Sequence, residues 1–150
     1  MRYLRTGRVS GVAIYVRSDP DDETLLPAAD QEFLCKRYCT DNQLPIVTYI
    51  RVSCDARESL EKLKGLLKTL PDKVDTIFAA RFNCYSIYLR ELGLICMQFQ
   101  CRNAWVYSLD VIGPLYRMLN VIRPEDYVQI DEIYRRTLLE LEENNSDAAE

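Results

Sequence analysis

Four short apolar runs, rich in β-branched and aromatic residues, constrain the fold of this chain more than any other feature. They are GVAIYVR at 11–17, PIVTYIR at 45–51, VDTIFAA at 74–80 and AWVYSL at 104–109. Runs of this length with polar borders are typical of strands that are buried on both faces of a sheet. Apolar residues at helical spacing lie between them, at 28–42, 57–70 and 86–101. This alternation predicts an α/β fold in three layers, with a mainly parallel sheet of four or five strands.

The chain departs from this alternation after residue 110. We expect residues 1–110 to form the core, and residues 111–143 to form a connector and a long C-terminal helix of the same domain. The acidic tail, 144–150, is expected to be disordered, because it contains little that a core can bury. The predicted helix has one apolar stripe through which a dimer is expected to form. The members of this C-terminal stripe are Tyr127, Ile130, Ile133, Tyr134, Leu138 and Leu141.

The cysteines and the absence of histidine limit the chemistry that the chain can perform. The six cysteines form no CxxC pair, so we expect free, packed thiols and no metal or cofactor, although a zinc site at Cys35 and Cys39 stays open. Serine–histidine and cysteine–histidine catalysis are excluded, because the chain has no histidine. Any catalysis must therefore rest on arginines and carboxylates.

The charge and the hydropathy of the chain limit the classes of partner that we expect it to bind. The net charge of −4 opposes broad electrostatic attraction to nucleic acid. No apolar run approaches the ~18 residues of a membrane span, and the basic N-terminus lacks the apolar core of a secretory signal. We therefore expect a cytoplasmic protein with no membrane partner.

Several stretches, in this order, resemble the catalytic domain of the serine recombinases, the resolvase/invertase family. VAIYVRSDP at 12–20 is similar to the opening strand of the family, whose usual form is Y-A-R-V-S-T. DARESLEKL at 55–63 resembles the D-R-x-G-L stretch, and residues 74–93 run without gaps against the strand and helix that hold K-L-D-R-L-S-R. Residues 31–42 and 101–110 are also similar to the family, and the final helix is loosely so. The resemblance implies a resolvase-like fold.

In this family a serine attacks a DNA phosphodiester while arginines support the phosphate, and dimers pair into tetramers. Arg17 matches the first-strand arginine, and Arg57 matches the arginine of the D-R-x-G-L stretch. The nucleophile position, two residues after Arg17, holds Asp19. Ser18 comes one residue early, which turns a strand side chain to the opposite face.

The resemblance also shows where the family pattern is lost. Asn83, Cys84 and Ile87 replace the aspartate and both arginines of the D-R-L-S-R stretch, and Asp19 is the fourth degenerate position. Phosphoryl transfer depends on positioning and on neutralising charge. The substitutions therefore predict a catalytically inactive homologue, a dimerising binding or assembly module associated with DNA recombination. It would pair with itself or with an active relative and bind DNA weakly.

The alternative function is an active DNA recombinase or nickase. Ser18 would then be the nucleophile, and Arg17 and Arg57 would bind the scissile phosphate.

Three further patterns leave alternatives open. The arginines at the predicted strand ends either form an anion pocket or pair with Asp19, Asp55 and neighbouring acids. The acidic run after Ser18 is expected to be a solvated turn rather than a Mg²⁺ or Ca²⁺ site. Cys84 is expected to be a packed thiol, with a reactive thiol as the alternative. The arginines of the first pattern are Arg17, Arg51, Arg57 and Arg81, and the acids of the second are Asp19, Asp21, Asp22 and Glu23.

Overall fold

The computed structural model describes residues 9–111 and 115, and the C-terminal stripe and the acidic tail lie outside these residues. Every strand and helix that was predicted before residue 110 is present, with bounds shifted by a few residues. By contacts, the chain divides into compact units of residues 1–120 and 121–150. The elements in chain order are β1 (Val12–Ser18), α1 (Ala28–Asp41), β2 (Ile46–Ser53), α2 (Ala56–Thr69), β3 (Thr76–Ala79), the 3₁₀-helix η1 (Phe82–Cys84), α3 (Leu89–Cys101) and β4 (Trp105–Ser108).

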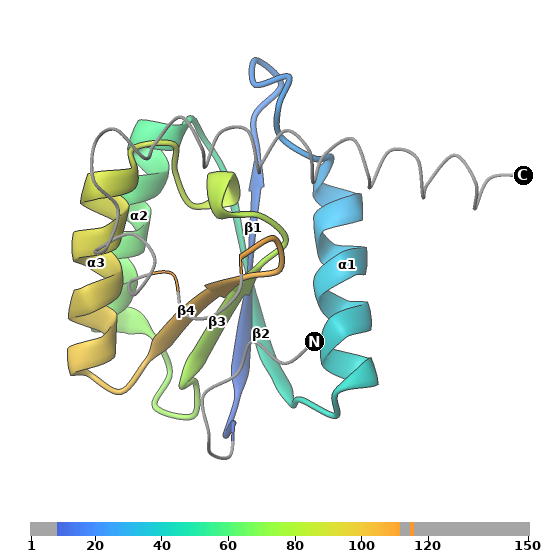
Figure 1. The fold of residues 1–150 in the computed structure, drawn as a ribbon, viewed down its shortest axis with the longest axis vertical. Coiled ribbons are helices and arrows are strands. Elements are labelled where there is room, and N and C mark those ends of the chain that lie inside the picture. The colour runs from blue at the N-terminus through green and yellow to red at the C-terminus, as the bar shows by residue number, and fades with distance from the viewer. Residues whose placement is uncertain (1–8, 112–114, 116–150) are drawn as a thin grey trace, which may run out of the picture. The chain divides into compact units, whose positions relative to one another are not determined.

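The four described strands form one parallel sheet with the order β2-β1-β3-β4. Helix α1 covers one face of the sheet, and α2 and α3 cover the other (Figure 1). The predicted α/β architecture is thereby confirmed. From β1 the chain crosses to β2 on one side, and from β3 it crosses to β4 on the other side. The carboxyl ends of the neighbours β1 and β3 therefore form the topological switch point, the place where open parallel sheets bind ligands.

Strand β1 is the centre of the core and alternates between the two faces of the sheet. Val12, Ile14 and Val16 pack with Cys35 and Cys39 of α1 in one buried cluster. Tyr15 lies between Ile14 and Val16 and therefore points to the other face. There its hydroxyl lies 2.7 Å from the Ser59 hydroxyl of α2. The predicted packing of the two α1 cysteines is confirmed.

Strand β2 differs from the expectation that each strand is buried on both faces. It is only partly buried along its length, and Val47 is 40% exposed. In the described sheet β2 lies at an edge and has a strand neighbour on one side only. Residue pattern alone does not distinguish an edge strand from a central one.

Gly11, directly before β1, is required by space. An added Cβ would lie 2.5 Å from the Lys73 carbonyl oxygen and 2.6 Å from Cγ2 of Val47. The same stretch is held by Asp75, whose carboxylate accepts hydrogen bonds from the backbone N–H groups of Ser10, at 3.0 Å, and Gly11, at 3.3 Å. The chain therefore enters β1 at the amino edge of the sheet, without room for a larger residue.

Gly11 and Gly65 predict opposite effects of the same substitution. Gly11→Ala should lower the free energy of unfolding by ~1–3 kcal/mol, because the methyl group overlaps fixed atoms. Gly65→Ala should raise it by ~0.5–1 kcal/mol, because Gly65 lies exposed within α2 and no atom lies within 4 Å of its added Cβ. Urea unfolding of both variants measures the changes, and shifts in the same direction would contradict the packing described for Gly11.

Candidate functional site

The Arg17 side chain lies at the switch point and has no exposed surface. Its Nε donates a hydrogen bond to the Cys84 carbonyl at 3.1 Å, and Nη1 donates to the Cys54 carbonyl at 3.2 Å. Nη2 donates to the Asn83 carbonyl at 2.7 Å and to the Asp22 carboxylate at 3.2 Å. A buried guanidinium is tolerated only when its N–H groups are satisfied. Arg17 thereby joins β1 to η1, to the loop before α2 and to the β1–α1 loop.

Two carboxylates of the β1–α1 loop turn toward this guanidinium. Oδ2 of Asp22 lies 3.2 Å from Arg17 Nη2, and Oδ2 of Asp19 lies 3.6 Å from Nη1. Asp22 also accepts hydrogen bonds from the Thr24 backbone N–H, at 3.1 Å, and hydroxyl, at 2.6 Å. Partial burial opposes ionisation of Asp22, but the hydrogen bonds from Thr24 and Arg17 outweigh it and lower its pKa. The loop therefore presents the ionised carboxylate of Asp22 to Arg17.

Gln31 of α1 holds the same loop from its other side, a role that the sequence reasoning missed. Its side-chain oxygen accepts a hydrogen bond from the Arg17 backbone N–H at 3.0 Å. Its Nε2 donates to the carbonyls of Arg17, at 2.7 Å, and Leu26, at 2.6 Å. Gln31 is fully buried on the same helix face as Cys35 and Cys39. In the sequence, Gln31 lies four residues before Cys35 and eight before Cys39, and this spacing on a buried helix face was the signal that could have indicated a buried polar contact.

Ser18 is the last residue of β1 and lies partly exposed. Its hydroxyl donates to the Val52 carbonyl of the neighbouring strand at 3.4 Å, a long hydrogen bond. Because consecutive strand residues point to opposite faces, Ser18 points away from the face that holds the Arg17 side chain. Within residues 9–111, no recorded hydrogen bond joins Ser18 to the side chain of Arg17 or Arg57.

Arg57 and Arg51 are exposed, and each pairs with a carboxylate. Nη1 of Arg57, in the first turn of α2, lies 2.6 Å from the Glu91 carboxylate of α3, and its Cζ lies 3.7 Å above the Tyr88 ring. Arg51 of β2 pairs with Glu32 of α1. Arg57 therefore serves the contact between α2 and α3, whereas Arg51 serves the contact between β2 and α1.

Arg81, Asp110 and Cys84 lie on the β3 side of the switch point. Arg81 is fully buried, and the Asp110 carboxylate accepts a hydrogen bond from the Phe82 backbone N–H at 3.2 Å. Burial raises the pKa of Asp110 to about 6, although the Arg81 guanidinium opposes this shift. Burial also raises the pKa of the Cys84 thiol to about 12, so Cys84 is protonated at neutral pH. It therefore lacks the thiolate that a reactive cysteine requires.

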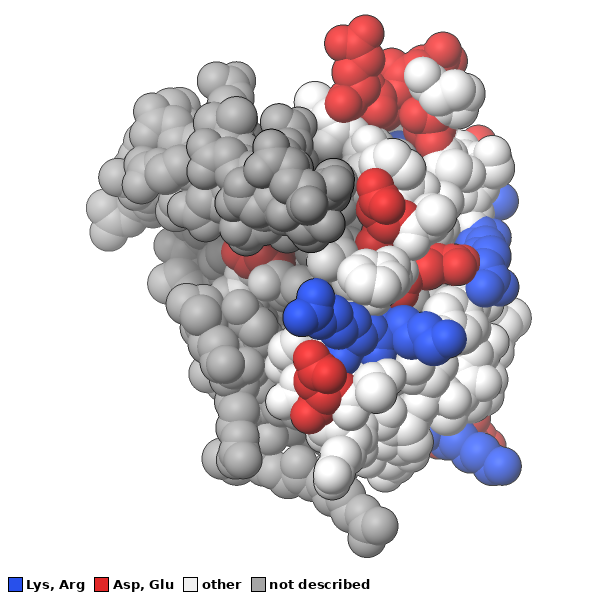
Figure 2. Space-filling model, turned by 90° about the vertical axis from the view of Figure 1, so that its right-hand side faces the viewer, with Lys and Arg blue, Asp and Glu red and all other residues white. Residues whose placement is uncertain are grey.

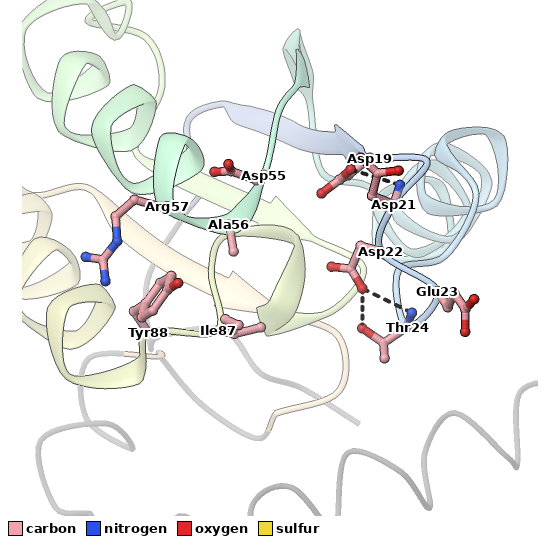
Figure 3. A pocket seen from close by; sticks show the side chains of 10 residues that line it. All are labelled: Asp19, Asp21, Asp22, Glu23, Thr24, Asp55, Ala56, Arg57, Ile87 and Tyr88. Atoms are coloured by element: carbon pink, nitrogen blue, oxygen red, sulfur yellow. Dashed lines mark hydrogen bonds between the residues drawn. The ribbon is translucent and has the colours of Figure 1, made fainter.

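A hollow of about 650 Å³ opens between the β1–α1 loop and the start of α2, and we name it the acidic groove. Figure 3 shows the β1–α1 loop on one side and the start of α2 with the connection into α3 on the other. In Figure 2, acidic side chains gather at the top of the molecule, the end from which this loop projects. Carboxylates at this density repel a phosphate. The lining residues are Asp19, Asp21, Asp22, Glu23, Thr24, Asp55, Ala56, Arg57, Ile87 and Tyr88.

In the described part of the chain, no group of three or more histidine, cysteine, aspartate or glutamate side chains is placed to hold a metal ion. Among the helices of residues 9–111, none has the length and apolar character that crossing a bilayer requires.

No family model matches the sequence. No curated protein matches it either. Solved structures do match. The N-terminal catalytic domain of TP901-1 integrase matches with a TM-score of 0.60 and 14% identity, over 85% of this chain and 98% of that domain. A resolvase family site-specific recombinase from Streptococcus pneumoniae matches with a TM-score of 0.59 and 13% identity, over 93% of this chain and 99% of the other.

A third match is the C-terminal catalytic domain of ISC1926 TnpA, an IS607-like serine recombinase. Its TM-score is 0.52 and its identity is 17%, over 66% of this chain and 70% of that chain. All three are recombinases, and the matches agree with the parallel sheet and the helix layers described above. This chain has the fold of the serine recombinase catalytic domains.

Proposed function

We propose that this chain is a serine-recombinase-like domain, associated with DNA recombination, that is catalytically inactive and acts as a dimerising binding or assembly module. It pairs with a second copy or with an active relative. The observation that carries the proposal is the state of Arg17, whose guanidinium is buried and bound to carbonyls and a carboxylate of its own chain.

A scissile phosphate would have to displace these partners. A guanidinium has five N–H groups, and the four recorded hydrogen bonds of Arg17 all end on oxygen atoms of the protein. Asp19 and Asp22 already neutralise its charge, and they repel a second anion from the same place. Arg57, the other matched arginine, is shared with Glu91. These contacts favour a structural Arg17 over a phosphate-binding one.

The assembly part of the proposal is supported by exposed apolar side chains along α3 and the residues before it. Ile87 is 55% exposed, Leu94 54% and Met97 41%. Large apolar side chains that gather on one exposed face are typical of interaction surfaces. The C-terminal stripe is a second apolar face in the sequence, and we propose that it forms the dimer.

The proposed structural role of Arg17 predicts unequal costs for two arginine substitutions. Arg17→Gln should lower the free energy of unfolding by ~3 kcal/mol or more, because it leaves buried carbonyls and a carboxylate without their partner. Arg57→Gln should lower it by ~1 kcal/mol or less, because the pair of Arg57 with Glu91 is exposed. Urea unfolding tests both. An unchanged stability of the Arg17 variant would show that its guanidinium is available for a ligand.

Catalytic inactivity predicts that the purified chain forms no covalent adduct with supercoiled DNA. Denaturing gels of chain and labelled DNA measure this, with an active serine recombinase as the positive control. Ser18→Ala is paired with Ser53→Ala, because Ser53 lies beside Ser18 in the β1–β2 register. An adduct that is lost in the Ser18 variant and kept in the Ser53 variant would contradict the proposal and establish Ser18 as a nucleophile.

A further inference from the structure

The acidic groove combines an exposed apolar wall with carboxylates. Ile87 and Tyr88, which form part of one wall, are 55% and 38% exposed. The β1–α1 loop with its acids lies across the hollow from them (Figure 3). A groove of this kind complements a segment that carries both apolar and basic side chains.

Some of the groove carboxylates already have partners within the chain. Asp19 and Asp22 face the Arg17 guanidinium. The Asp55 carboxylate accepts a hydrogen bond from the Glu58 backbone N–H at 2.8 Å and caps α2. These contacts hold the walls of the groove in place.

Asp21 and Glu23 carry charge that the described residues do not balance. Both are exposed, and no ion pair within residues 9–111 includes either carboxylate. Arg57, the basic residue of the lining, pairs with Glu91. The groove therefore retains negative charge that a cationic occupant can neutralise.

The sequence of this chain contains a segment with the required chemistry. Residues 1–8, MRYLRTGR, carry Arg2, Arg5 and Arg8 together with Tyr3 and Leu4, and they contain no acid. We name this stretch the basic arm. Its arginines complement the carboxylates of the groove, and its tyrosine and leucine complement the Ile87 and Tyr88 wall.

The arginine nearest to β1 in the basic arm, Arg8, cannot reach the groove of its own copy. The Ser10 and Gly11 backbones are held by Asp75 at the amino edge of the sheet, whereas the groove lies beyond the carboxyl end of β1. The seven residues of β1 span about 20 Å at ~3.3 Å per residue. Arg8 lies two residues before Ser10 and therefore reaches at most ~7 Å of extended backbone from it. The three arginines can occupy a groove together only in another copy.

We propose that the basic arm of one copy docks in the acidic groove of a second copy. The two surfaces lie at opposite ends of β1, so the contact is head-to-tail and each copy offers one arm and one groove. Such a contact extends into chains or closes into rings. It is separate from the dimer proposed for the C-terminal stripe and does not depend on catalytic inactivity.

Sedimentation velocity of the full chain tests the proposal. The wild type should form species that grow with concentration at ~20 mM salt and dissociate at ~500 mM salt, because exposed charges are screened. Arg2→Gln/Arg5→Gln/Arg8→Gln and Asp21→Asn/Glu23→Gln should each weaken this association about tenfold or more. Any dimer formed by the C-terminal stripe should persist in both variants.

Two control variants carry the same charge changes elsewhere on exposed surface. Asp41→Asn/Glu61→Gln matches the groove variant, and Lys62→Gln/Lys64→Gln/Lys68→Gln matches the arm variant. Both should associate as the wild type does. Equal weakening by the controls would mean that net charge alone governs association, and this result would overturn the proposal.

Mixing the arm variant with the groove variant identifies the partner surfaces. The arm variant keeps an intact groove and the groove variant keeps an intact arm. The mixture should therefore form one head-to-tail contact between one copy of each variant, and the resulting pair should not extend into longer chains. A wild type that shows no salt-sensitive association would overturn the proposal and leave the groove to a basic partner other than this chain. A mixture that restores no contact would overturn it as well.

Discussion

The buried guanidinium of Arg17 is the interaction on which the site depends. A permanent charge without exposed surface is costly unless acceptors surround it. The carbonyls of Cys54, Asn83 and Cys84 meet this need, together with the carboxylate of Asp22. Because these acceptors come from three separate loops, one side chain positions the whole carboxyl edge of β1. Gln31 completes the arrangement by binding the backbone on both sides of the β1–α1 loop.

The same interaction is the basis of our proposal that this chain is catalytically inactive. A fold sets where a site lies, whereas the side chains set what the site can do. Here the switch point lies between β1 and β3, and the carboxylates of Asp19 and Asp22 turn toward the Arg17 guanidinium. The charge presented at the groove is negative rather than positive. An anionic backbone is repelled there, and a cationic segment is attracted.

The proposed head-to-tail assembly follows from the negative charge of the acidic groove. The β1–α1 loop is held from within, and its exposed acids, Asp21 and Glu23, form no ion pair with other residues of the described range 9–111. The apolar wall formed by Ile87 and Tyr88 adds contact area that charge alone does not supply. We therefore propose that the acidic groove serves as a docking surface between copies rather than as a phosphate site.

The sequence by itself determined the alternation of strands and helices, because period and composition reflect local burial. It also identified the buried α1 face and the substitutions at Asp19, Asn83 and Cys84. It did not determine which of Arg17, Arg51 and Arg57 pair with which acids, since those partners lie on other elements. Only the tertiary structure showed β2 at an edge of the sheet, and only it turned the carboxylate of Asp22 toward Arg17. Those outcomes depend on strand order and loop closure, which join residues that are distant in the chain and leave no local pattern.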